Sequence, residues 1–110
     1  MKMKQTTFIS MVVALLWVPV VSADHHGGDT EKGEALFETK CSVCHFSDSN
    51  EKKIGPGLAG IKNGKLPSGK DATQENLIKN INEGGGGMPA FEKLLTDEEK
   101  GYIIALLKTL

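Results

Sequence analysis

Two cysteines and a histidine stand together in the segment Cys41-Ser42-Val43-Cys44-His45, and the chain has no other cysteine. If this segment forms a helical turn, both thiols lie on one face, because residues at i and i+3 are neighbours on a helix. Both sulfurs can then reach the two vinyl groups on one edge of a porphyrin, and the imidazole of His45 can bind the iron from one side. The pattern is typical of c-type haem attachment. It predicts one covalently bound haem c held by Cys41, Cys44 and His45.

Other uses of the cysteine pair compete with this interpretation. A redox-active dithiol is expected among alternating strands and helices, and the sequence contains no convincing strand. A tetrahedral zinc site needs two further Cys or His ligands, but the remaining histidines, His25 and His26, lie upstream in a polar stretch. A lone structural disulfide would explain the cysteines and leave His45 without a role. Haem attachment therefore accounts best for the whole segment.

A haem iron bound by one histidine has a second axial position, and Met88 is the best candidate for it. The other methionines lie near the N-terminus: Met1, Met3 and Met11. A thioether is a soft, neutral ligand that favours reduced iron. A single methionine is by default a core side chain, but Met88 lies between four glycines, residues 84–87, and Pro89. We therefore predict that Met88 is the second axial ligand.

The N-terminus is typical of a secretory signal peptide. Two lysines precede an apolar run, residues 8–21, and small residues follow at the expected cleavage point. The sequence predicts that residues 1–23 are removed and that residues 24–110 form the mature domain. The apolar run is short for a membrane span, which disfavours an uncleaved anchor. Export through a Sec-type signal predicts a periplasmic location.

The composition of the chain sets limits on its size and partners. Its 110 residues carry 13 Lys and Arg against 14 Asp and Glu, a net charge of −1, so we expect no nucleic-acid partner. Residues 24–110 suffice for one small domain. This domain has few aromatic side chains, namely Phe37, Phe46, Phe91 and Tyr102. Such a chain is marginally stable by itself, and a buried haem would add apolar surface to its core.

The spacing of apolar residues predicts three helices. The first is capped by Asp29 or Thr30 and runs into the cysteine–histidine segment. A long loop then covers residues 46–70, where no periodicity is sustained. Such a loop is unusual in a compact domain unless it is functional, and wrapping a flat cofactor is one use for it. Its inward contacts are predicted to be Leu58, Ile61 and Leu66.

The second helix is capped by Asp71 or Thr73 and ends near Glu83, before the glycine run. Its buried side is predicted to carry Leu77, Ile78 and Ile81. The last helix begins with a capping box at residues 96–99 and continues to the C-terminus. The predicted fold is therefore all-α, with three main helices and long loops wrapped around one covalently attached haem.

Pro56 follows the histidine segment at a distance that suits a supporting role. A metal-bound histidine usually donates its other ring N–H to an acceptor, which fixes the ring. The carbonyl of Pro56 could serve, since this residue is well placed in the sequence after the cysteine–histidine segment. The alternative is that Pro56 only shapes a turn, and spacing alone does not separate the two.

From Gly33 to Leu110 the chain resembles the small class I cytochromes c. Gly33, Phe37 and Cys41 stand four apart, as in that family, where the glycine lets the first helix cross the last. Residues 55–58 resemble the family's loop whose proline carbonyl orients the axial histidine. Residues 88–91 resemble its axial-methionine loop, and residues 95–99 the start of its final helix.

Two features depart from the family pattern. The family's aromatic residue in the last helix is Leu106 here, with Tyr102 one turn earlier. The exact contact at the helix crossing is therefore expected to differ. The four-glycine run is also richer than usual, and it indicates a looser methionine loop.

The resemblance implies a soluble periplasmic electron carrier that performs one-electron transfer and has no substrate chemistry of its own. We expect a monomer that meets redox protein partners and contacts membranes only through partner complexes. Two alternatives stay open. One is a haem-based ligand-binding or sensor protein in which Met88 is labile, and the other is the electron-transfer subunit of a larger oxidoreductase.

The long loop is rich in lysine. No acidic residue occurs from Lys52 to Lys70, and five lysines lie in that span: Lys52, Lys53, Lys62, Lys65 and Lys70. If they surround the haem edge, they would attract an acidic partner surface. A simply solvated loop is the other interpretation.

Overall fold

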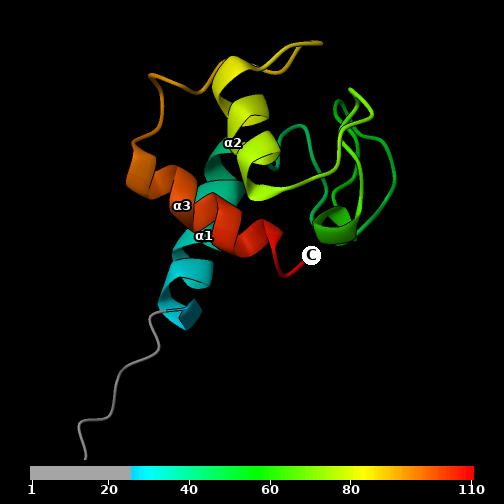
Figure 1. The fold of residues 1–110 in the computed structure, drawn as a ribbon. Coiled ribbons are helices and arrows are strands. Elements are labelled where there is room, and N and C mark those ends of the chain that lie inside the picture. Colours follow the sequence, from blue (N-terminus) through cyan, green and yellow to red (C-terminus); the bar gives the residue numbers. More distant parts are fainter. Residues whose placement is uncertain (1–25) are drawn as a thin grey trace, which may run out of the picture.

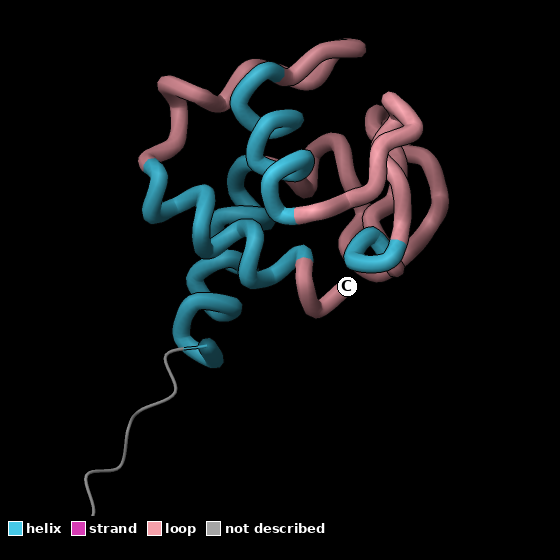
Figure 2. The backbone as a smooth tube through the Cα atoms, in the orientation of Figure 1, coloured by secondary structure: helices cyan, strands magenta, loops and turns pink. Residues whose placement is uncertain are grey.

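The computed structural model describes residues 26–110, with side chains from Asp29 onward. In this part of the chain the α-helices are α1 (His26–Lys40), α2 (Gln74–Glu83) and α3 (Asp97–Leu107). A 3-10 turn, η1 (Ile61–Asn63), lies between α1 and α2, and no strand occurs in these residues. Helix α3 crosses α1, and the long loop lies on the other side of α2 (Figures 1 and 2). The all-α prediction is confirmed. The predicted signal peptide lies outside the described residues.

The first helix begins at His26, before the predicted cap at Asp29 or Thr30, so that prediction of its start is wrong. Asp29 lies in the first turn of α1 instead. An acidic side chain is favourable anywhere in a first turn, because it faces the positive end of the helix dipole. The acidic residue Asp29 therefore indicated the first turn of α1 correctly, but it is not the residue that caps the helix.

Helix α2 is capped by Thr73, whose hydroxyl accepts a hydrogen bond from the Asn76 N–H at 3.2 Å. The other candidate cap, Asp71, pairs with Lys65 at 2.7 Å. This hydrogen bond to Lys65 holds the pKa of the Asp71 carboxyl below its usual range. The pair closes a turn in which the Leu66 N–H bonds the Lys70 carbonyl at 2.8 Å.

Helix α3 has the predicted capping box. The Glu99 N–H donates to the Thr96 hydroxyl at 3.1 Å, and the Thr96 N–H donates to the Glu99 carboxylate at 2.8 Å. The helix ends at Leu107, so its predicted continuation to the C-terminus is wrong. The Thr109 side chain donates to the Leu106 carbonyl at 2.7 Å, which turns the chain out of the helix.

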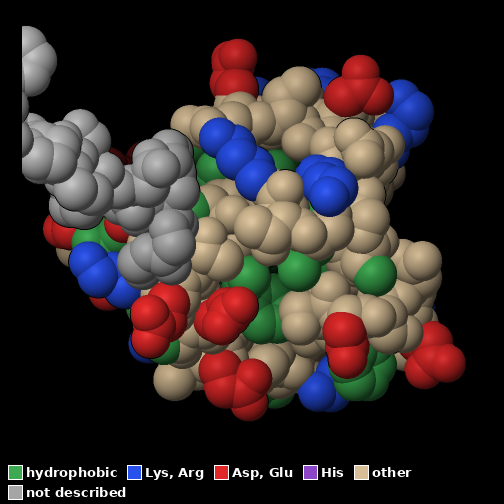
Figure 3. All heavy atoms as spheres, turned by 90° about the horizontal axis from the view of Figure 1, so that it is seen from below, with side chains coloured by type: hydrophobic (Ala, Val, Ile, Leu, Met, Phe, Trp, Pro, Cys, Tyr) green, Lys and Arg blue, Asp and Glu red, His purple; other side chains and the backbone are tan. Residues whose placement is uncertain are grey.

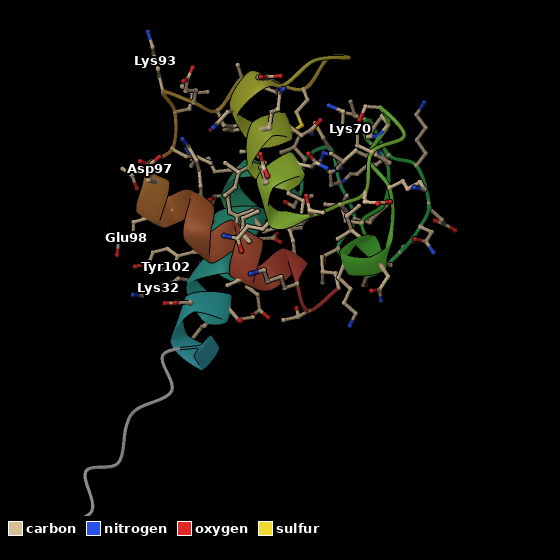
Figure 4. The ribbon with its side chains drawn as sticks, in the orientation of Figure 1. Lys32, Lys70, Lys93, Asp97, Glu98 and Tyr102 are labelled. Atoms are coloured by element: carbon tan, nitrogen blue, oxygen red, sulfur yellow. The ribbon has the colours of Figure 1, made fainter. Side chains whose placement is uncertain are left out.

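The crossing of α1 and α3 depends on Gly33. A Cβ atom at this position would lie 2.2 Å from the Tyr102 carbonyl oxygen and 3.0 Å from Leu106 Cβ. The close backbone contact predicted at Gly33 is therefore confirmed. Beside it the Lys32 ammonium lies 4.6 Å from the centre of the Tyr102 ring, and the Tyr102 hydroxyl donates to Glu98. These three side chains lie together at the crossing (Figure 4).

The core is formed by apolar side chains from all three helices and from both long connections. Its buried members are Phe37, Leu66, Leu77, Ile81, Phe91, Leu95, Ile103, Ile104, Leu106 and Leu107. Leu58, Ile61 and Ile78 are partly buried and pack against this core. The predicted inward contacts of the loop and of α2 are thus confirmed. Within residues 26–110, no helix has the length and apolar character needed to cross a membrane.

Candidate functional site

The cysteine–histidine segment continues directly from the end of α1 as a helical turn. The Cys44 and His45 N–H groups both donate to the Cys41 carbonyl, at 3.0 and 2.9 Å. Cys41 and Cys44 are free, half-buried thiols, and Cys41 packs against the core. Burial raises the pKa of the Cys41 thiol to about 11. The turn on which the predicted arrangement of thiols and imidazole depends is present.

The imidazole of His45 is held by the loop that follows it. Its Nδ1 atom lies 2.7 Å from the Pro56 carbonyl oxygen. A carbonyl oxygen can only accept, so Nδ1 carries a proton, and in the neutral imidazole Nε2 then has the lone pair. Behind the ring, Gly55 leaves no room for a side chain, because a Cβ atom there would lie 2.5 Å from His45 Cε1. Pro56 therefore does more than shape a turn.

Backbone hydrogen bonds place the Pro56 carbonyl. The Gly55 N–H donates to the Cys44 carbonyl at 2.7 Å, and the Leu58 N–H donates to the Phe46 carbonyl at 2.8 Å. The Lys53 ammonium donates to the Ser42 carbonyl at 2.7 Å and lies 5.0 Å from the centre of the Phe46 ring. The loop is thus attached to the cysteine–histidine turn on both sides of the residue whose carbonyl binds His45.

Met88 closes a tight turn at the end of the glycine run, which projects beyond α2 (Figure 1). The Gly85 N–H donates to the Met88 carbonyl at 2.9 Å, and the Met88 N–H donates to the Gly85 carbonyl at 3.1 Å. Gly86 and Gly87 between them have φ of 62° and 96°, the pattern of a type I′ turn. The glycine run is therefore a hydrogen-bonded turn, whereas the sequence indicated a looser loop.

The Met88 side chain has a polar neighbour on α2. The Asn80 side-chain Nδ2 donates to the Met88 sulfur at 3.7 Å, and both residues are half-buried. The sequence interpretation did not identify Asn80. A signal for it exists, since Asn80 lies one turn after Leu77 and next to Ile81, two residues on the buried face of this helix. A polar residue at such a position usually has a partner to bind.

The residues of this region fit a covalently bound haem. Two thiols lie on one helical turn, an imidazole presents a free Nε2, and the thioether of Met88 packs against the same core cluster as Cys41. Imidazole and thioether are both ligands of haem iron in proteins. Among residues 26–110, no group of three or more His, Cys, Asp and Glu side chains comes together that could hold a metal ion.

Comparison with known proteins gives the family. The family model described as "Cytochrome C oxidase, cbb3-type, subunit III" matches residues 28–107. The chain belongs to this cytochrome c family. It is a small monohaem class I cytochrome c with one covalently bound haem c, as the resemblance implied. It is accordingly an electron-transfer protein.

Individual cytochromes are similar over different shares of the chain. Cytochrome c6 of Rippkaea orientalis is 27% identical over 97 residues, covering 88% of this chain and 85% of its own length. Cytochrome c6 of Leptolyngbya boryana is 32% identical over 71 residues, 64% of this chain and 80% of its own length. Cytochrome c of Gibberella zeae is 41% identical over 58 residues, 50% of this chain and 55% of its own length.

Proposed function

We propose that this cytochrome is a periplasmic one-electron carrier in which Cys41 and Cys44 hold the haem through thioethers, and His45 and Met88 are the two axial ligands. The observation that carries the proposal is the 2.7 Å hydrogen bond from His45 Nδ1 to the Pro56 carbonyl. This bond fixes the tautomer and the orientation of the ring, and it leaves Nε2 free to bind iron. The hydrogen bond and the cysteine pair beside it together support a ligand role, because the bond holds one ring nitrogen and leaves the other available.

The residues act together in a simple way. The bound haem supplies an iron centre that takes up and releases one electron. His45 and Met88 would both bind the iron of this haem, so that no position would stay open for oxygen, peroxide or a substrate. Gly55 and Pro56 hold the imidazole, and the glycine turn holds the backbone of Met88. The cytochrome therefore has no substrate chemistry of its own, and its partners are redox proteins.

The location and the mature domain follow from the N-terminal sequence. The basic start, the apolar run and the small residues at 21–23 support export through a Sec-type signal. On this proposal residues 1–23 are removed and residues 24–110 act in the periplasm. Haem attachment there uses both cysteines, so that neither is left to form a disulfide.

A second candidate is the electron-transfer subunit of a larger oxidoreductase. It is favoured by the description of the matching family, which names a subunit of a cbb3-type oxidase. The chemistry at Cys41, Cys44, His45 and Met88 would be the same, and only the partner would be fixed. Purification from the native membrane separates the two. Stable co-purification with a dehydrogenase or oxidase supports the subunit, and recovery as a lone small protein supports the carrier.

Visible spectra of the purified protein and of the variant Met88→Ala test the ligand set. The wild type should show covalent low-spin haem and, when oxidised, the weak long-wavelength band of an iron–thioether bond. Met88→Ala should lose that band and keep its haem, because the cysteines and His45 are unchanged. Leu94→Ala, at a side chain that is 62% exposed, is the control and should keep the band. Survival of the band in Met88→Ala would overturn the assignment of Met88.

A further inference from the structure

The Met88 backbone is fixed more firmly than a glycine-rich sequence suggests. Two hydrogen bonds join Met88 to Gly85. The backbone of Gly84 also packs directly on this segment, since a Cβ atom there would lie 2.4 Å from the Met88 carbonyl oxygen and 2.6 Å from Pro89. The remaining freedom lies in the side chain, which has three rotatable bonds and adapts easily to its surroundings.

Asn80 makes hydrogen bonds with residues at both ends of the glycine turn, Gly84 and Met88. Its backbone carbonyl accepts from the Gly84 N–H at 2.8 Å, where α2 stops. Its side-chain amide donates to the Met88 sulfur at 3.7 Å, where the turn ends. Asn80 is held in a regular helix, so its amide starts from a defined position. A side chain with this geometry restrains the one group of the turn that the backbone leaves free.

We infer that Asn80 is a positioning residue for the electron-transfer centre, which orients the Met88 sulfur and raises the reduction potential. This inference rests on the proposed ligation by Met88. A thioether sulfur has two lone pairs, and the hydrogen bond from Asn80 occupies one and leaves the other for iron. The same bond draws electron density from sulfur and weakens its donation to the metal. Oxidised iron depends more on that donation, so the bond favours the reduced state.

The test compares three variants of the intact haem protein by redox titration. Asn80→Leu keeps similar volume and removes the donor. At a fixed ambient potential it should lower the ratio of reduced to oxidised protein by about threefold to tenfold, the usual worth of one hydrogen bond. A tenfold change corresponds to about 59 mV for a one-electron couple. Asn80→Gln restores an amide donor and should recover most of the loss.

Asn76→Leu is the matched control on the same helix. The Asn76 side chain donates to the Asp71 carbonyl at 2.9 Å and makes no hydrogen bond with Met88 in the described structure. This variant should leave the potential unchanged. An unchanged potential in Asn80→Leu, or an equal shift in Asn76→Leu, overturns the inference. If the wild type itself lacks the iron–thioether band, the proposed ligation by Met88 fails first, and that result is distinct from failure of the role of Asn80.

A measurement on the wild type covers the case in which Asn80→Leu does not fold. In the reduced protein, nuclear Overhauser contacts should join the Asn80 side-chain amide protons to the Met88 methyl group. Their presence supports the orienting role. Their absence, with the methionine bound to iron, shows that the amide is directed elsewhere and overturns the inference.

Discussion

At the scale of single residues, the orientation of His45 depends on one proton and one missing side chain. The proton on Nδ1 binds the Pro56 carbonyl, and the lack of a Cβ at Gly55 lets the loop backbone lie against the ring. The Pro56 carbonyl binds Nδ1, and the backbone of Gly55 lies against Cε1, between the two ring nitrogens. The loop thus fixes the position of Nε2, the atom proposed to bind iron, through contacts with the rest of the ring.

Replacing Gly55 by alanine should therefore disturb the iron centre. The new methyl group would lie 2.5 Å from His45 Cε1, so the ring must move and its bond to Pro56 must weaken. An imidazole with a weaker hydrogen bond at Nδ1 donates less electron density to iron and stabilises the oxidised state less, so redox titration should show a higher potential. Overpacking of this kind should also cost about 1–3 kcal/mol in the free energy of unfolding.

Gly64→Ala is the control for this change. A Cβ atom at Gly64 would meet its nearest neighbours at 3.5 Å, an ordinary contact distance, and this glycine is not among those with positive φ. The potential of Gly64→Ala should equal that of the wild type. Equal potentials in all three proteins would show that the ring tolerates the contact and that Gly55 has no part in orienting it.

The residue scale also shows where a sequence can be interpreted directly. His45, Met88 and Pro56 could be found because their chemistry is tied to short spacings along the chain. The position of Asn80 on the buried face of α2 indicates only that it has a partner. That the partner is Met88 could not be predicted, since the contact exists only after four glycines with positive φ reverse the chain. Glycine permits these conformations without requiring them. The presence of four glycines therefore does not predict the direction in which the turn goes.

At the scale of helices, the crossing of α1 and α3 should be the most sensitive contact. Gly33→Ala places a methyl group 2.2 Å from the Tyr102 carbonyl oxygen, a backbone atom of α3, so the two helix backbones must move apart. We expect a loss of about 3 kcal/mol or more in the free energy of unfolding, at or above the upper end for overpacking. Chemical denaturation of the haem protein measures it.

Gly101→Ala in α3 is the matched control. Nothing lies within 4 Å of a Cβ atom at this exposed position. Alanine should stabilise the helix by about 0.5–1 kcal/mol, because it restricts the unfolded chain and suits a helix better than glycine does. Similar effects of the two substitutions would show that helix propensity, and not the crossing, determines the cost at Gly33.

The helix boundaries show which signals are local. The caps of α2 and α3 were predictable, because Thr73 and Thr96 act on N–H groups three residues away. The start of α1 was not, since polar and glycine residues before Asp29 carry no strong signal. Contacts across the loop, such as Lys53 with the Ser42 carbonyl, depend on how the loop returns to the cysteine–histidine turn. Sequence periodicity says nothing about that path.

At the scale of the whole molecule, basic and acidic side chains are nearly equal in number, 13 against 14. Figure 3 shows one face on which acidic and lysine side chains surround an apolar area. Two of the five loop lysines contact their own chain, since Lys53 binds the Ser42 carbonyl and Lys65 pairs with Asp71. Lys70 lies on the loop side, away from Lys32 at the helix crossing (Figure 4). This pattern favours a solvated loop over a strong electrostatic docking surface.

The salt dependence of electron transfer should accordingly be shallow. Small redox reagents test this without a protein partner, since ferricyanide is an anion and cobalt phenanthroline complexes are cations. Screening acts within about 10 Å at 0.1 M salt, so both rates should change by less than about threefold between low and moderate ionic strength. A steep fall of the ferricyanide rate, with a rise for the cationic reagent, would instead show a positive surface at the haem edge.

The central claim is that His45 and Met88 close both sides of the iron, and carbon monoxide tests it most directly. The gas is added to the reduced protein at neutral pH, with Met88→Ala as the positive control. The variant should bind it rapidly, because one axial position is open. The wild type should keep its spectrum. Rapid and tight binding by the wild type would contradict a closed electron carrier and would support a ligand-binding protein with a labile methionine.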